Sequence, residues 1–163
     1  MQGRKWEDLQ NSLKETLNTI NKINKNSKVT IINFSNKIFI DYQDKPASSI
    51  NVYDLTFQNG GTNFSAAFIV GFEQIQRITK NDIVLVFMTD GMSDYPKDEI
   101  AFIREYINSS YFKKLKIKFD FSALGFQCKS GILDEMAREL GGTTYFAQDA
   151  IQLKRTFIEI LNK

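Results

Sequence analysis

Hydrophobic positions recur in this chain with two different periods. Over residues 4–24, apolar side chains return at spacings of three and four, which predicts an amphipathic helix. Short runs rich in β-branched and aromatic residues predict strands at 29–34 and 37–42. The link Ser35-Asn36 between these strands is so short that they must form an antiparallel hairpin.

The rest of the chain continues to alternate between the two periods. A polar stretch at 43–62 contains a short strand or turn near 52–57. The uninterrupted apolar run 83–88 predicts a strand covered on both faces, and alternating apolar and charged residues at 115–121 predict a strand with one wet face. Further helices are predicted at 64–78, 100–107, 131–140 and 151–161, and a further strand at 143–146.

Apart from the hairpin, predicted strands and helices follow one another in turn. This order predicts an α/β fold: a three-layer, doubly wound, Rossmann-like and mostly parallel sheet with one antiparallel edge hairpin. The 163 residues suit one domain over 1–163. Ligands of such sheets bind at the carboxyl ends of the strands. Asp90 follows the most buried strand and Thr62 lies in a glycine-rich loop before a helix, so both are candidates for a site.

Composition narrows the possible functions. Lys and Arg number 21 and Asp and Glu 19, a net charge of +2, which is a poor match for a dedicated nucleic-acid binder. The absence of His excludes His-based triads and His zinc sites. Cys128 is the one cysteine and cannot form an intramolecular disulfide. With no apolar run long enough for a membrane span and no signal-like segment, we expect an intracellular, cytoplasmic protein.

Two short segments carry the candidate chemistry. In Gly60-Gly61-Thr62-Asn63, the Thr62 hydroxyl could bind a ligand, although Thr62 or Asn63 as a helix N-cap is the simpler interpretation. In Asp90-Gly91, a carboxylate at the exit of a buried strand suits a hard cation. The simpler interpretation is a turn that ends the strand.

Taken together and in order, these segments resemble the von Willebrand factor A (integrin I-like) domain. Gly60-Gly61-Thr62 is similar to the family's threonine motif and Thr89-Asp90-Gly91 to its aspartate motif. Residues 141–147 resemble the family's final strand and the entry to its last helix. Residues 1–6 look like the segment that follows the family's first motif, Asp-x-Ser-x-Ser.

The resemblance implies a protein–protein interaction module and no enzyme. In that family a divalent cation, Mg²⁺ or Mn²⁺, lies at the carboxyl edge of the sheet in a metal-ion-dependent adhesion site (MIDAS). Carried over, the Thr62 hydroxyl and the Asp90 carboxylate would hold the metal, and Ser93 and Asp94 would lie near its rim. An Asp or Glu of the partner protein would complete the coordination.

The chain departs from the family because the first strand and the Asp-x-Ser-x-Ser motif are absent. Metal binding should therefore be weak or absent. Three explanations remain open. The domain is an N-terminally incomplete piece of a longer protein, or the sheet closes up by pairing 29–34 with 83–88. In the third, a second copy supplies the pairing, as a strand-swapped or edge-paired homodimer.

Two other functions are weighed against this one. The chain could be a metal-independent scaffold that binds partners through the loops around Asp90. It could also be a metal-dependent phosphohydrolase using Asp90 and Asp94, but no nucleophile paired with a base is evident. The basic run of Lys113, Lys114, Lys116 and Lys118 is most simply a solvated face, with an anionic partner as the alternative.

Overall fold

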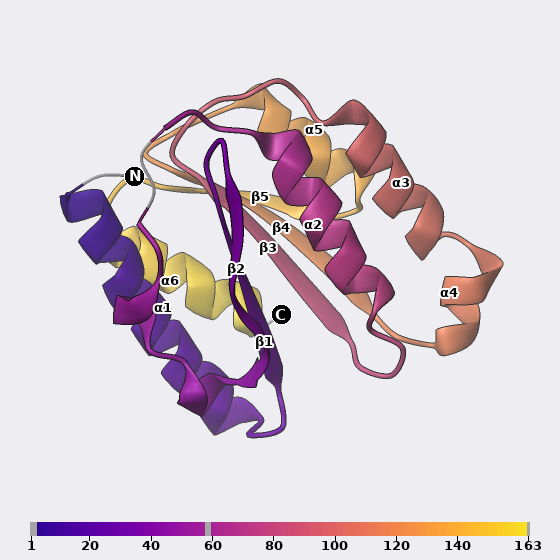
Figure 1. Cartoon of the computed structure of the whole chain (residues 1–163), viewed down its shortest axis with the longest axis horizontal. Coiled ribbons are helices and arrows are strands. Elements are labelled where there is room, and N and C mark those ends of the chain that lie inside the picture. The colour runs from indigo at the N-terminus through magenta and orange to yellow at the C-terminus, as the bar shows by residue number, and fades with distance from the viewer. Residues whose placement is uncertain (1–2, 58–59, 163) are drawn as a thin grey trace. The chain divides into compact units, whose positions relative to one another are not determined.

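The computed structural model describes residues 3–57 and 60–162 (Figure 1). Met1 and Gln2, with which the family resemblance begins, lie outside these residues. The helices are α1 (Arg4–Ile23), α2 (Phe64–Gln76), α3 (Lys97–Ile107), α4 (Ser110–Leu115), α5 (Gly131–Glu139) and α6 (Ala150–Leu161), with 3₁₀ turns η1 (Ala47–Ser49) and η2 (Val52–Asp54). The strands are β1 (Lys28–Phe34), β2 (Ile38–Pro46), β3 (Ile83–Thr89), β4 (Phe119–Phe126) and β5 (Thr143–Ala147).

The chain divides into two compact units. Unit 1 comprises Met1–Gly61 together with Ala147–Lys163, and unit 2 comprises Thr62–Phe146. Unit 1 therefore contains α1, the β1–β2 hairpin, both 3₁₀ turns and α6. Unit 2 contains α2 to α5 with β3, β4 and nearly all of β5.

The hairpin of unit 1 is antiparallel, as its short link predicts. Phe34 pairs with Ile38 next to the turn, and Lys28 pairs with Pro46 at the far end. The register shifts on either side of Ile31, which marks β-bulges that interrupt the ladder. The second strand extends to Pro46, beyond the predicted end at residue 42.

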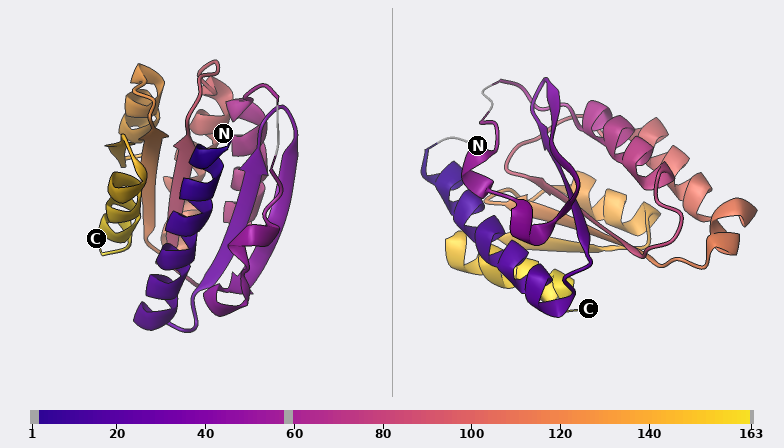
Figure 2. Two further views of the ribbon diagram at one scale, coloured as in Figure 1. Left: turned by 90° about the vertical axis from the view of Figure 1, so that its left-hand side faces the viewer. Right: turned by 60° about the horizontal axis from the view of Figure 1, so that its bottom comes forward.

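The core of unit 1 lies between α1 and the segment that follows the hairpin. The Gln10 amide donates a hydrogen bond to the Val52 carbonyl (3.1 Å), which holds η2 against the helix. Helix α6 lies alongside α1 (Figure 2), and Lys154 forms an ion pair with Glu15 between the two helices. The buried residues of this core are Leu17, Ala47, Val52 and Leu55.

Unit 2 is built on a parallel sheet with strand order β3-β4-β5. Strands β3 and β4 pair in unbroken register from Ile83 opposite Phe119 to Thr89 opposite Gly125. Because the pairing is parallel, the carboxyl ends of the strands lie at the same edge of the sheet. That edge carries Asp90.

One face of this sheet is covered by aromatic side chains from α2. The ring of Phe87 on β3 lies 5.0 Å from Phe64 and 4.7 Å from Phe68 between ring centroids, and Phe68 also contacts Phe121 on β4. Side chains alternate along a strand, so Gly125 on β4 faces the same side as Phe121. Gly125 packs next to Leu133 of α5, which places α5 on the face that α2 covers (Figure 1).

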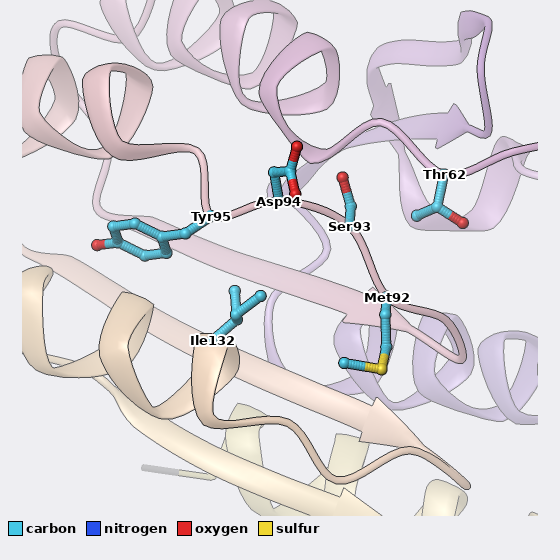
Figure 3. Close-up of a pocket in the computed structure, with 6 residues that line it drawn as sticks. All are labelled: Thr62, Met92, Ser93, Asp94, Tyr95 and Ile132. Atoms are coloured by element: carbon cyan, nitrogen blue, oxygen red, sulfur yellow. The ribbon is translucent and has the colours of Figure 1, made fainter.

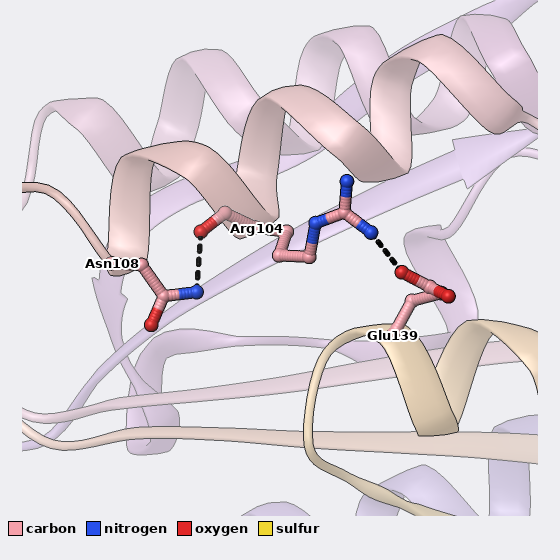
Figure 4. Close-up of polar contacts among 3 residues, drawn as sticks. All are labelled: Arg104, Asn108 and Glu139. Carbon is pink, nitrogen blue, oxygen red and sulfur yellow. Dashed lines mark hydrogen bonds and ion pairs between the residues drawn. The ribbon is translucent and has the colours of Figure 1, made fainter.

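Helices α3 and α5 are joined by an ion pair between Arg104 and Glu139 (Figure 4). The carbonyl of Arg104 also accepts a hydrogen bond from the Asn108 side-chain amide (2.9 Å), which closes the last turn of α3. Both charged side chains are partly exposed, so the pair positions the helices more than it stabilises them.

One prediction from the sequence needs correction. The strand predicted at 115–121 is wrong in its first half, because Ser109 caps a short helix, α4, by accepting a hydrogen bond from the Phe112 N–H. Lys116 then turns the chain with φ of 56°, and β4 begins at Phe119 and is buried rather than wet on one face. The prediction near 52–57 is resolved in favour of a turn, η2.

The α/β fold class predicted from the sequence is confirmed. Among the described residues, three strands form a parallel sheet and two form the antiparallel hairpin. Pairing of residues 29–34 with residues 83–88 is not part of either sheet.

Tyr106 provides a first test of the packing in unit 2. Its ring contacts Phe72 and Phe112 at centroid distances of 5.6 and 5.4 Å, while its hydroxyl is buried and has no hydrogen-bond partner among the described residues. Burial raises the pKa of this hydroxyl above its ordinary value of 10.0. We expect Tyr106→Phe to raise the free energy of unfolding by about 1 kcal/mol, because the variant keeps the ring and loses an unsatisfied polar atom.

Urea denaturation of wild type and variant measures this change. Tyr111→Phe, at an exposed ring of the same cluster, is the matched control and should change stability very little. A loss of 1 kcal/mol or more in Tyr106→Phe would contradict the assignment of an unsatisfied hydroxyl.

Candidate functional site

Thr62 meets the turn that follows β3. Asn63 is the N-cap of α2, its side chain accepting a hydrogen bond from the Ala66 N–H (3.0 Å), so the hydroxyl of Thr62 is not needed as the cap. A Cβ atom built on Gly91 would lie 3.2 Å from the Thr62 hydroxyl oxygen. The two motifs that the sequence singles out are thus adjacent, at the carboxyl end of β3.

The turn itself is held by the last residue of β3. The buried Thr89 hydroxyl accepts a hydrogen bond from the Gly91 N–H (3.0 Å). The Cys128 thiol, from the loop after β4, lies 3.5 Å from the Gly91 carbonyl oxygen and donates to it. Asp90 is therefore carried by a turn that is fixed from two sides, and it is itself half-buried.

A pocket of about 590 Å³ lies beside this turn (Figure 3). Figure 3 shows Met92, Ser93, Asp94 and Tyr95 following one another along one lip, with Ile132 on one side of them and Thr62 on the other, on the segment that leads into α2. Asp90 does not line the pocket. The lining residues are Thr62, Met92, Ser93, Asp94, Tyr95 and Ile132.

Ser93 connects this lip to α2. Its hydroxyl accepts a hydrogen bond from the Phe64 N–H, the first residue of the helix, at 3.4 Å. Such an N–H has no partner within its own helix, so Ser93 satisfies it. Asp94, the next residue, is exposed and is the carboxylate that lines the pocket.

Tyr95 adds a further hydroxyl group. Burial raises the pKa of this hydroxyl above 10.0, and the carboxylates of Glu135 and Glu139 raise it further, against the opposing effect of Arg104 and Arg138. The phenol is therefore protonated and uncharged at neutral pH. The pocket presents three neutral hydroxyls and one carboxylate.

The donor set limits which cation could be held. Magnesium prefers six oxygen ligands and commonly keeps several waters when a protein supplies one or two carboxylates. Near the turn these oxygens come from Thr62, Asp90, Ser93 and Asp94. Within residues 3–57 and 60–162, no group of three or more His, Cys, Asp or Glu is placed to hold a metal ion. The residues present fit a weak site completed by water, and they do not fit a closed one.

Sequence reasoning missed three of the residues that line the pocket. Met92 and Tyr95 flank the pair Ser93-Asp94. Their closeness to Asp90 in the sequence was the one signal that could have included them among the candidate residues. Ile132 comes from α5, whose start is marked by Ser130 capping the Ile132 N–H (3.2 Å). Nothing in the sequence says that this helix start reaches the loop after β3.

No helix in the part of the chain that the structure describes is long and apolar enough to cross a membrane.

Comparison with known proteins identifies the fold. No family model matches the chain. No curated protein matches it either. A solved structure of a von Willebrand factor type A protein from Catenulispora acidiphila matches with a TM-score of 0.72 and 17% sequence identity. The match covers 96% of this chain and 37% of that one.

The fold class of the chain is α/β, with a parallel sheet and an antiparallel hairpin. Its fold is that of a von Willebrand factor type A domain, which confirms the resemblance read from the motifs. At 17% identity the likeness is one of fold, and the chain spans about a third of the length of that protein.

Proposed function

We propose that the chain is a protein-binding module that recognises an acidic side chain of a partner at the turn following β3. The observation that supports the proposal is that the Thr62 hydroxyl lies next to Gly91 of the turn after β3, which brings the two motifs together at the carboxyl edge of the sheet. The von Willebrand factor type A fold supports it, since such domains mediate protein interactions. The partner is a protein that presents an Asp or a Glu.

A divalent cation, Mg²⁺ or Mn²⁺, is the group proposed to join the two carboxylates. It would supply the positive charge that lets Asp90 and a partner carboxylate lie close together, which would otherwise repel. The Thr62 hydroxyl and the Asp90 carboxylate would hold it. Because these two residues provide few of the six oxygens, we expect a dissociation constant in the millimolar range.

Thermal unfolding with and without the cation tests this site. A ligand that binds the folded state alone adds RT ln(1 + [L]/Kd) to the free energy of unfolding. With 10 mM Mn²⁺ and a Kd of about 1 mM, the gain is about 1.4 kcal/mol, or about 3–6 °C in Tm for a chain of this size. The gain should disappear in Asp90→Ala and shrink in Thr62→Ala.

Asp54→Ala is the matched control, since it removes an exposed carboxylate of unit 1 and should leave the shift intact. An equal shift in Asp90→Ala would place the cation elsewhere and refute this site.

A metal-independent scaffold is the second candidate. It is favoured by the lack of a three-member group of Asp, Glu, Cys or His among the residues that the structure describes. Under this alternative, Mn²⁺ gives no shift and Asp90→Ala still weakens partner binding. Under the first proposal, EDTA and Asp90→Ala weaken binding alike.

We propose no catalytic role for the chain. The phosphohydrolase alternative would use Asp90 and Asp94, but Asp90 does not line the pocket that contains Asp94. Hydrolysis of p-nitrophenyl phosphate above background, abolished by Asp94→Asn, would revive that alternative.

A further inference from the structure

A basic surface lies at the amino edge of the unit 2 sheet, opposite the proposed binding site. It is formed by two segments far apart in sequence, the turn from α2 into β3 and the stretch from α4 into β4. Figure 1 shows this turn and α4 at the same end of unit 2. The exposed lysines of this surface, called here the amino-edge lysines, are Lys80, Lys113, Lys114, Lys116 and Lys118.

Two hydrogen bonds join the two segments. The Ile83 N–H donates to the Lys118 carbonyl (2.8 Å), and the Lys118 N–H donates to the Asp82 carboxylate (2.8 Å). The turn that carries Lys80 is therefore held against the start of β4. The clustering of positive charge follows from the fold, because 32 or more residues separate Lys80 from the other members.

Two carboxylates lie among the five lysines. Asp120 forms an ion pair with Lys118 (3.4 Å), and Asp82 accepts the backbone N–H of the same residue. Both carboxylates thus contact Lys118. Within the described part of the chain, no ion pair involves the other four lysines: Lys80, Lys113, Lys114 and Lys116. The surface therefore keeps an excess of positive charge.

We propose that the amino-edge lysines dock unit 2 on an anionic lipid surface. Charge complementarity is the first argument, since a plane of acidic headgroups attracts clustered lysines without demanding fixed geometry. The second is composition: lysines, which act as hydrated point charges, outnumber arginine on these two segments, whereas guanidinium groups are the usual choice for bidentate reading of nucleic-acid phosphates. The one exposed arginine on these two segments, Arg77, donates a hydrogen bond to the Gln74 side chain (3.1 Å). The third is Tyr111 of α4, which is 54% exposed beside Lys113 and Lys114 and suits the membrane–water boundary.

Vesicle sedimentation tests the proposal. The whole chain is mixed, in EDTA and 50 mM salt, with vesicles of phosphatidylcholine alone or with 30% phosphatidylserine. We expect binding to the anionic vesicles only, weakening as salt screens the charges. The variant Lys80→Gln/Lys113→Gln/Lys114→Gln should lower the partition coefficient by about 100-fold, at about fivefold per lysine.

The matched control removes the same charge elsewhere. Lys22→Gln/Lys25→Gln/Lys28→Gln changes three exposed lysines at the end of α1 and the start of β1, in unit 1. It should stay within about threefold of wild type. Circular dichroism of both variants establishes that they fold.

Three outcomes would overturn the proposal: equal binding to both kinds of vesicle, equal losses in the two triple variants, or tighter binding of duplex DNA than of anionic vesicles. The last would assign the surface to nucleic acid. Because EDTA removes divalent cations, failure here is distinguishable from failure of the proposed cation site.

Discussion

Replacing Gly125 with alanine is expected to lower the free energy of unfolding by about 3 kcal/mol. A Cβ atom at this position would lie 1.9 Å from the carbonyl oxygen of Cys128 and 3.1 Å from its carbonyl carbon. Both are backbone atoms, so no side-chain rotation relieves the clash, and the loop after β4 must move. Forced overpacking of this kind costs from about 1 to more than 3 kcal/mol.

The displacement should also reach the proposed binding site. The Cys128 thiol donates to the Gly91 carbonyl, so a shifted loop removes one of the two contacts that fix the turn carrying Asp90. We therefore expect Gly125→Ala to weaken any Mn²⁺ stabilisation as well as the fold.

Urea denaturation gives the stability of the variant, and the Mn²⁺ shift is then measured on the protein that remains folded. Gly131→Ala is the control, because a Cβ there meets nothing within 4 Å and the residue opens α5. The control should be neutral or slightly stabilising. Stability within 0.5 kcal/mol of wild type in Gly125→Ala would mean that the loop accommodates the methyl group freely, against this expectation.

Truncating Phe87 to alanine should cost even more, about 3–5 kcal/mol. The side chain is 7% exposed and packs against the rings of Phe64 and Phe68, one edge-to-face and one stacked. The variant loses the transfer free energy of the ring and leaves a cavity between β3 and α2 that rigid neighbours cannot fill. Aromatic pairing adds a further contribution that the alanine variant forfeits.

Chemical denaturation followed by circular dichroism measures the loss. Phe102→Ala on α3 is the matched control, since its ring is 52% exposed and its removal should cost less than 1 kcal/mol. If the two variants lose equal stability, Phe87 is not the centre of the unit 2 core.

The sequence predicts most helices and strands of this fold because their hydrophobic periods are long and regular. The helix at 4–24 and the strand at 83–88 lie within a residue of α1 and β3. The strand predicted at 115–121 fails because Leu115, Ile117, Phe119 and Phe121 alternate by coincidence across a helix end and a strand start. The Ser109 hydroxyl caps a helix there by accepting a hydrogen bond from the Phe112 N–H, and the period-two pattern does not reveal this cap.

The arrangement of strands in sheets is harder to predict than the strands themselves. Pairing depends on which edges meet in space, so one continuous sheet and two separate sheets share the same order of elements along the chain. The two-sheet arrangement is visible only in the hydrogen-bond ladders.

The candidate site can be derived from the sequence only in part. The rule that ligands bind at strand carboxyl ends selects Thr62 and the Asp90 turn, and the structure places these next to each other. The same rule cannot say which side chains line the neighbouring pocket. Ile132 enters it from a helix that begins about 40 residues later in the chain, and Asp90 stays outside it.

The division of unit 1 between the two ends of the chain bears on the order in which the protein folds during synthesis. Unit 2 is a continuous stretch, Thr62–Phe146, and all of its native contacts become available once that stretch has left the ribosome. Helix α1 precedes unit 2 in the chain but packs against α6, which follows unit 2. At about 5–20 residues per second, Ala147–Lys163 takes about one to three seconds to translate. During that time the apolar stripe of α1 stays uncovered by α6, so unit 1 cannot complete its packing until well after the residues of unit 2 have been made.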